Sequence, residues 1–268
     1  MLSRQRFELV PAVDIVDRAV RSLEPGAAVS VTALPKQTLE ETASTVLALA
    51  AAGFDAIPHL PAGALRSREE LSELLVRLED SPVRALFVIG GDHDRGESPF
   101  ADGGELLEAI RERSGDRFRL GVAAYPEGHP AFDVEAGIRL LSQKAPLADF
   151  AITQMCFDAP AVAGFVRAAS AAGIELPLWL GTPARVSLAR LARIGMRIGV
   201  GSSMGMLRHR SHRRLLGSFD PLELRAELEQ ELAELPEAAR SLVAGRHVFT
   251  FNTLPKPAPA GRVAADAE

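Results

Sequence analysis

The chain lacks the features that mark secreted and membrane proteins. Its 268 residues include a single cysteine, Cys156, so an internal disulfide is excluded, which suits a reducing compartment. The longest apolar run, residues 46–54, is about half as long as a membrane span requires. Residues 1–6 are too polar for a secretory signal. These absences predict a cytoplasmic protein that does not enter a membrane.

An excess of positive charge is also absent. The chain has 30 basic and 35 acidic residues and a net charge of −5, which argues against nucleic acid as a partner. Basic side chains gather at residues 208–214, after a glycine-rich turn at residues 199–203. This segment either meets a polyanion or forms a solvated helix face, and its glycine spacing matches neither the Walker nor the dinucleotide motif.

Short apolar runs alternate with segments of helical period. Strands are predicted at residues 6–10, 28–32, 56–59, 85–89, 119–123, 150–153, 178–181 and 247–252. Helices are predicted at residues 15–22, 39–52, 68–78, 104–113, 134–144, 161–172, 188–194 and 221–234. Eight strands separated by helices in about 250 residues predict an α/β fold, the (β/α)8 TIM barrel. The alternative is a doubly wound sheet, which usually needs a glycine-rich turn where this chain has Val10, Pro11 and Ala12.

The end of the chain departs from the regular barrel pattern. Residues 1–254 are predicted to form a single catalytic barrel domain, and the proline- and alanine-rich residues 255–268 a disordered tail. Nothing after the last strand resembles a regular last outer helix. The preceding helix or a partner subunit must cover the groove beside that strand, unless it stays open, so a homo-oligomer is worth expecting.

Polar side chains stand at the ends of the first three predicted strands. Glu8 lies among apolar residues, and burial raises the pKa of a carboxyl group, so Glu8 is a candidate general acid. The other interpretation is an edge glutamate beside a loop. Thr32 and His59 can each contact a ligand or satisfy a nearby backbone group.

Two later strands also deliver polar groups. Residues 121–135, GVAAYPEGHPAFDVE, run from an apolar strand into a turn that carries Tyr125 and His129. Residues 151–154, AITQ, form a second short strand that ends in Gln154. Parallel strands that present polar groups at their carboxyl ends are typical of a binding site in this fold.

The fourth strand ends in a glycine pair and two carboxylates. Gly90 and Gly91 permit close approach of the backbone to a ligand, and Asp92, His93 and Asp94 follow. Aspartate with histidine suggests a divalent metal, but no second cluster supplies the remaining ligands. The sequence therefore predicts no metal site.

Taken in order, these pieces resemble the methylenetetrahydrofolate reductase family, in a divergent bacterial branch. The matching pieces span nearly the whole chain: Phe7-Glu8, Ser30-Val31-Thr32, Pro58-His59-Leu60, Gly91-Asp92, AAYPEGHP at 123–130, Lys144, AITQ at 151–154, Phe157-Asp158, Ala172-Gly173-Ile174 and FTFN at 249–252. The family is a (β/α)8 barrel of one-carbon metabolism. It passes a hydride from NAD(P)H to bound FAD and then to the methylene carbon of methylenetetrahydrofolate.

The resemblance implies roles for the strand-end residues. Glu8 would protonate the folate nitrogen as the methylene ring opens to an iminium. Asp92 would lie beside the flavin and the pterin, and Gln154 would bind the hydrogen-bonding edge of the pterin. The positions that match flavin contacts are Thr32, His59, Gly91, Asp92, Tyr125, His129 and Lys144, with Lys144 near the phosphates.

Three departures from the family pattern concern the flavin. Gly90 stands where the family usually has an arginine, and Gly137 and Leu140 stand where it has an aspartate and an asparagine that contact the adenosine half. Losing several such hydrogen bonds, each worth roughly 0.5–3 kcal/mol, weakens binding by orders of magnitude. The alternatives to a flavoprotein are a flavin-independent reductase and a non-redox folate-binding accessory protein. Residues 198–210 also differ from the best-known bacterial reductases. They are more similar to a divergent branch of the family in which the reaction runs toward oxidation of methyltetrahydrofolate.

Overall fold

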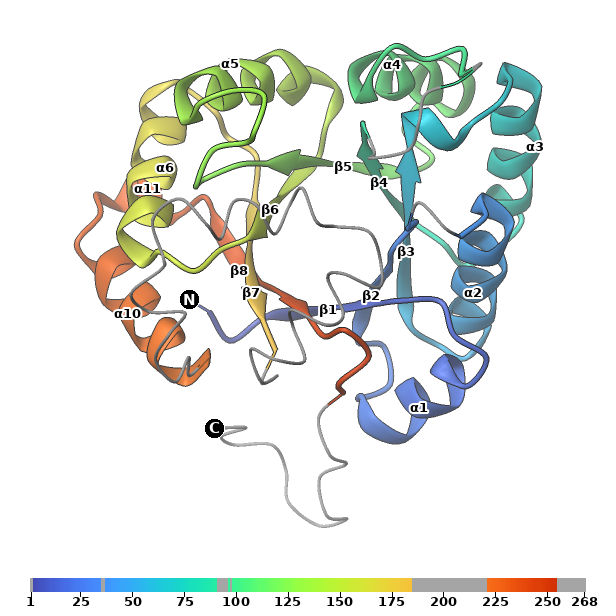
Figure 1. Ribbon diagram of the computed structural model, residues 1–268, viewed down its shortest axis with the longest axis horizontal. Coiled ribbons are helices and arrows are strands. Elements are labelled where there is room, and N and C mark those ends of the chain that lie inside the picture. Colours follow the sequence, from blue (N-terminus) through green and yellow to red (C-terminus); the bar gives the residue numbers. More distant parts are fainter. Residues whose placement is uncertain (1, 35–36, 91–95, 97, 185–220, 255–268) are drawn as a thin grey trace.

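A computed structural model describes residues 2–34, 37–90, 96, 98–184 and 221–254. Eight parallel strands close into a barrel in sequence order, with β8 beside β1 (Figure 1). The strands are β1 (Gln5–Leu9), β2 (Ala28–Val31), β3 (Asp55–Pro61), β4 (Ala85–Ile89), β5 (Arg119–Ala124), β6 (Phe150–Met155), β7 (Leu178–Pro183) and β8 (Val243–Phe249). The predicted (β/α)8 barrel is confirmed.

Helices surround the ring of strands (Figure 1). They are α1 (Ile15–Ser22), α2 (Leu39–Ala51), α3 (Arg68–Glu79), α4 (Gly103–Ser114), α5 (Val134–Lys144), α6 (Ala159–Ala171), α10 (Pro221–Ala233) and α11 (Glu237–Arg240), with short 3-10 turns η1 (Ala62–Ala64) and η2 (Ala145–Leu147). The helix predicted at 188–194 lies outside the described residues. The short α11 was not predicted. Within the described residues no helix has the length and apolar composition of a bilayer span.

Local sequence signals set where several helices begin and end. Thr38 and Glu41 form a reciprocal capping box at the start of α2: the Thr38 hydroxyl accepts from Glu41 N at 3.1 Å, and the Glu41 carboxylate accepts from Thr38 N at 2.7 Å. Gly53 and Gly173 follow α2 and α6 with φ of +90° and +73°, where a side chain would strain the backbone. These ends agree with the predicted ones to within two residues.

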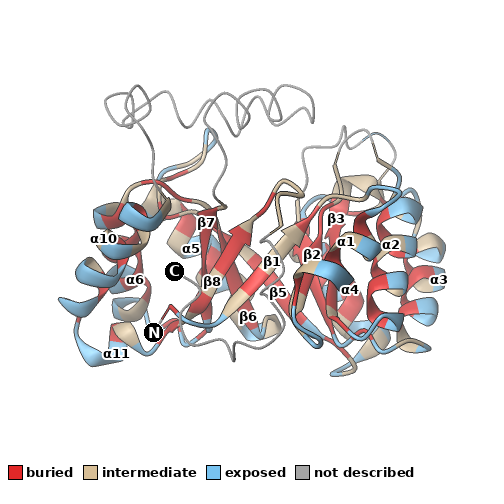
Figure 2. Ribbon diagram, turned by 90° about the horizontal axis from the view of Figure 1, so that it is seen from below, coloured by how far each residue is buried: buried red, intermediate tan, exposed pale blue. Residues whose placement is uncertain are grey.

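Apolar side chains fill both the space between strands and helices and the interior of the barrel. The strands are largely buried, and exposure is concentrated on the outer faces of the helices (Figure 2). The interior cluster consists of Ile57, Ala85, Phe87, Phe150, Ile152 and Trp179. Two glycines make room for its rings. A Cβ at Gly121 would lie 2.2 Å from the Phe150 ring, and one at Gly245 would lie 2.9 Å from Trp179.

The last strand differs from its predicted limits. It runs from 243 to 249 rather than from 247 to 252, and Phe251 and Asn252 have φ of +48° and +57°. The Asn252 amide accepts from Val10 N and donates to Val10 O, both at 2.8 Å, and the Thr250 hydroxyl donates to Glu8 O. Side-chain hydrogen bonds to the end of β1 thus replace the strand ladder after residue 249.

The outer layer beside β8 comes from elements that precede it. The helices α10 and α11 pack against α6. Within the described residues, β8 is followed by a turn at 250–254, and no helix follows it there. Residues 255–268, predicted to be a disordered tail, lie outside the described part, so the domain boundary stays a prediction.

Candidate active site

A carboxyl group and two imidazoles meet inside the barrel. Glu8 comes from β1, His59 from β3 and His247 from β8. His247 Nε2 lies 3.2 Å from Glu8 Oε2, and His59 Nε2 lies 3.8 Å from the same oxygen. The two histidine residues are 6% and 0% exposed, and the Glu8 side chain is 13% exposed. The three strands hold these groups away from bulk water.

Burial controls the protonation of this cluster. It raises the pKa of Glu8 to about 7, and the neighbouring His59 opposes this shift. Burial also lowers the pKa of His59 to about 4 and that of His247 to about 3. Near neutral pH both imidazoles are therefore uncharged, and Glu8 is close to its midpoint. Such a carboxyl group can act as a general acid or as a general base.

The two oxygens of Glu8 have different surroundings. Both histidines approach Oε2, and within the described part of the chain Oε1 has no hydrogen-bond partner. A bound molecule can therefore exchange a proton with Oε1 while Oε2 stays among the imidazoles.

Other buried polar groups of the barrel strands and their ends make no hydrogen bond within the described structure. Ser30 Oγ, Thr32 Oγ1 and both amide atoms of Gln154 are buried without a hydrogen bond in the described structure. An unsatisfied buried polar group costs about 1–3 kcal/mol, so such groups normally bind water or a ligand. Gln154 presents a donor and an acceptor together. The site therefore suits a polar ligand with a mixed hydrogen-bonding edge.

Two predicted flavin residues, Tyr125 and His129, lie in the loop between β5 and α5. His129 stacks on Phe132 at 4.5 Å between ring centroids, and Tyr125 meets both rings edge-on at 5.1 and 5.2 Å. Backbone hydrogen bonds of 2.9 and 3.1 Å join His129 and Phe132. The Phe132 ring also covers Gly137, where a Cβ would lie 3.5 Å from it. The structure brings the predicted pair together, packed around a phenyl ring.

Lys144 lies on the outer layer, in the last turn of α5. Burial lowers its pKa, and the charge of Asp102, the N-cap of α4, opposes this shift. Leu140, on the same helix, is 38% exposed. Gly137 and Leu140, which the family resemblance matches to adenosine contacts, supply no polar side chain.

The remaining predicted site residues follow β4, where the described part of the chain is interrupted after Gly90. Gly91 and Asp92 lie outside the described residues, as do the glycine-rich turn at 199–203 and the basic residues 208–214. Gly90 is described, and a Cβ there would meet no atom within 4 Å. Among the described side chains, no group of three or more histidine, cysteine or acidic residues is arranged to hold a metal ion.

Glu127 connects the loop that follows β5, which carries Tyr125 and His129, to the segment that follows β6. Its Oε1 accepts from Phe157 N at 2.6 Å and from Asp158 N at 2.8 Å, and burial raises its pKa. Asp158 in turn caps α6 by accepting from Ala161 N at 3.0 Å. Glu127 thus fixes the β5 loop against the segment that follows Gln154.

Sequence reasoning did not single out His247 or Arg6. A signal for both existed, because a closed barrel places its last strand beside its first. In the observed register His247 is the partner of Arg6, and Phe249 is the partner of Glu8. The histidine of β8 therefore shares the neighbourhood of the acid on β1.

Comparison with known sequences points to one family. A family model described as methylenetetrahydrofolate reductase matches residues 11–194. Methylenetetrahydrofolate reductase 1 of Schizosaccharomyces pombe is 34% identical over 123 residues, which cover 43% of this chain and 20% of that protein. The 5,10-methylenetetrahydrofolate reductase of Pectobacterium carotovorum is 34% identical over 129 residues, covering 47% of this chain and 42% of that protein. The matched part thus spans less than half of either relative.

A solved structure shares the fold over nearly the whole chain. It is an uncharacterised protein from Clostridium thermocellum that binds two copies of 5-methyl-5,6,7,8-tetrahydrofolic acid. The TM-score is 0.66 with 12% sequence identity, and the match covers 94% of this chain and 90% of that one. At this identity the likeness concerns the fold.

Proposed function

Because the chain belongs to the methylenetetrahydrofolate reductase family, we propose that it interconverts methylenetetrahydrofolate and methyltetrahydrofolate by hydride transfer. The observation that carries this proposal is Glu8, a buried carboxyl group with a pKa of about 7 and one oxygen left for a ligand. The folate-binding protein of the same fold supports the substrate class.

Glu8 supplies the proton that the chemistry needs. In the reductive direction its Oε1–H protonates the folate nitrogen as the bond between that nitrogen and the methylene carbon breaks. The electron pair of that bond stays on the nitrogen, and the resulting iminium accepts a hydride to become a methyl group. In the oxidative direction the Glu8 carboxylate takes the proton back. A group with a pKa near the working pH serves both directions.

Gln154 is proposed to orient the pterin. Both of its amide atoms are buried and unpartnered in the described structure, and a pterin offers adjacent donors and acceptors. Asp92 lies outside the described residues, and its place beside the flavin and the pterin is implied by the family resemblance alone.

The hydride is proposed to come from NAD(P)H, and the family resemblance predicts FAD as its carrier. Thr32 and His59 have buried, unpartnered polar atoms suited to a polar ring system at the barrel mouth. At the two positions that the resemblance matches to adenosine contacts, Gly137 lies beneath Phe132 and Leu140 is apolar. This mismatch favours a second candidate, a reductase in which NAD(P)H delivers the hydride directly to the folate. The proton step at Glu8 is the same in both cases.

The first test measures turnover and colour on one sample. The purified protein is assayed for reduction of methylenetetrahydrofolate with NADH and with NADPH, and its spectrum is recorded before and after adding FAD. Turnover without flavin absorbance, unchanged by added FAD, supports the flavin-independent candidate. Folate binding without hydride transfer from either donor would contradict the proposed activity and favour an accessory protein.

Replacing the acid tests its role directly. We expect Glu8→Gln to lower the reductive kcat by about a hundredfold to ten-thousandfold, because the amide cannot donate the proton in the same way. In the wild type the reductive rate should fall as pH rises through about 7, and the oxidative rate should rise. Steady-state kinetics across pH checks both statements. A Glu8→Gln enzyme with unchanged kcat would refute the acid role.

A further inference from the structure

An arginine lies inside the barrel, on the same face of β1 as Glu8. The guanidinium carbon of Arg6 is 3.9 Å from the ring centroid of Trp179 and 4.4 Å from that of Phe150. Arg6 is 4% exposed and makes no ion pair within the described part of the chain. A buried cation held mainly by aromatic rings is costly to desolvate, so its charge calls for an explanation.

The nearest explanation is His247. The two residues are register partners on β1 and β8, and the charge of Arg6 lowers the pKa of His247 in addition to burial. His247 Nδ1 and Arg6 Nη1 are both buried without a hydrogen-bond partner in the described structure. A guanidinium donates hydrogen bonds and cannot accept them, so Arg6 cannot accept a proton from Nδ1–H. The positive charge of Arg6 therefore favours the tautomer in which Nδ1 carries a lone pair and Nε2 carries the proton.

We propose that Arg6 and His247 are positioning residues for the acid: in the buried, uncharged His247 ring the charge of Arg6 keeps the proton on Nε2, and Nε2–H donates to Glu8 Oε2. The exchangeable proton of Glu8 is thereby directed to Oε1, the oxygen open to a ligand. The catalytic use of this arrangement rests on the proposed function, whereas the arrangement itself can be measured without turnover.

The charges around the pair are consistent with this assignment. Glu8 faces His59 from β3 and His247 from β8, and burial keeps both histidines neutral at pH 7. Arg6 is influenced by Arg119, Asp55 and Arg4, of which only Asp55 is negative. If His247 instead took a proton, it would form an ion pair with Glu8 and hold the carboxyl group ionised. The acid would then have no proton to give near neutral pH.

The primary test is nuclear magnetic resonance on the wild-type protein. Nitrogen-15 shifts of the His247 ring report which nitrogen carries the proton, and a carbon-13 titration of the Glu8 carboxyl group reports its midpoint. We expect the Nε2–H tautomer throughout the pH range in which the protein is folded and the His247 ring is uncharged. A proton on Nδ1, or an imidazolium at neutral pH, would overturn the proposal.

Variants then separate the two residues. His247→Leu removes the donor, so the Glu8 midpoint should rise by about one pH unit or more, while His247→Gln, which keeps an N–H, should restore it. Arg6→Met keeps an apolar stem between the rings and removes the charge, so the pKa of His247 should rise by about one unit or more. Midpoints that do not move in either variant would also overturn the proposal.

Arg4 provides the matched control. It lies 5.3 Å from the same Trp179 ring but is exposed, so Arg4→Met should leave both titrations unchanged. In the reductive pH profile, His247→Leu should move the limb assigned to Glu8 to higher pH, and Arg4→Met should not move it. If the titrations behave as expected but the wild type shows no turnover, the proposed function fails and the positioning inference stands.

Discussion

A buried carboxyl group beside two buried imidazoles can titrate in either of two orders. When an imidazole takes the proton first, the result is an ion pair, and when the carboxyl group keeps it, all three groups stay neutral. Burial raises the pKa of Glu8 to about 7 and lowers those of His59 and His247 to about 4 and about 3, so the carboxyl group keeps the proton. Between about pH 4 and about pH 7 the three groups are therefore mostly uncharged, and His247 lies within hydrogen-bonding distance of Glu8.

This order of titration has a consequence for stability. The pKa of Glu8 in the folded state lies above its ordinary value, so its stabilising contribution is complete below about pH 4.5 and is lost as pH rises through about 7. We expect Glu8→Gln to gain about 3 kcal/mol in unfolding free energy relative to the wild type between about pH 4.5 and about pH 8. Urea unfolding of both proteins at several pH values measures it.

The histidines change the stability with pH in the opposite direction, and both are present in the wild type and in Glu8→Gln. Their contribution is present above their ordinary pKa and is lost as pH falls through about 4 and about 3. To first order it cancels in the comparison. A stability difference between Glu8→Gln and the wild type that does not change with pH would contradict the raised pKa of Glu8.

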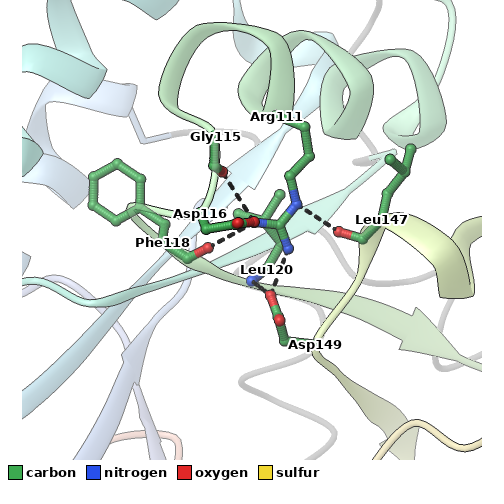
Figure 3. Close-up of polar contacts among 7 residues, drawn as sticks. All are labelled: Arg111, Gly115, Asp116, Phe118, Leu120, Leu147 and Asp149. Atoms are coloured by element: carbon green, nitrogen blue, oxygen red, sulfur yellow. Dashed lines mark hydrogen bonds and ion pairs between the residues drawn. The ribbon is translucent and has the colours of Figure 1, made fainter.

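Among the elements, one arginine joins the end of α4 to the segments that lead into β5 and β6. Arg111, in the last turn of α4, donates to the carbonyls of Leu147, Gly115 and Phe118 at 3.0–3.1 Å (Figure 3). It also donates to the Asp149 carboxylate at 2.6 Å. The same carboxylate accepts from Leu120 N at 2.7 Å. The side chain is 17% exposed, so these bonds are partly shielded from water.

We expect Arg111→Ala to lower the unfolding free energy by about 2–4 kcal/mol, because several partners lose their donor at once. Arg139 is the control, since its ion pair with Glu135 lies at the surface, with side chains 61% and 84% exposed. Arg139→Ala should change the stability by less than about 1 kcal/mol. Denaturant unfolding compares the two variants. Equal losses would show that the bonds of Arg111 add nothing beyond a surface pair.

The elements also show what the sequence could predict. Strand and helix positions followed from apolar period and from local signals such as Thr38 with Glu41, which act within one turn of chain. The end of β8 did not follow, because Asn252 and Thr250 bond to β1, which is distant in sequence. For the same reason Glu8 was predicted as an acid from its own neighbours, whereas His247 required knowledge of which strands pair.

At the scale of the whole molecule, residues 1–254 are predicted to be one domain. Trp179 is the single tryptophan of the chain and lies in the barrel interior, whereas circular dichroism reports mainly the outer helices. In a single cooperative domain, tryptophan fluorescence and circular dichroism should lose their folded signals at the same denaturant concentration. Two separate midpoints would contradict the single-domain prediction.

The sequence also predicts a homo-oligomer and a cytoplasmic location, and both stay predictions. Within the described residues, a turn at 250–254 follows β8. Sedimentation equilibrium of the purified protein would measure its mass in solution directly.

The acid and its histidine neighbour stand 239 residues apart in the chain, on the first strand and the last. During synthesis Glu8 leaves the ribosome long before His247 exists. Until the ring of strands closes, water can reach the carboxyl group, which then titrates like any free glutamate. The raised pKa of Glu8 is therefore absent from the nascent chain, and it is established only when β8 pairs with β1 and closes the barrel.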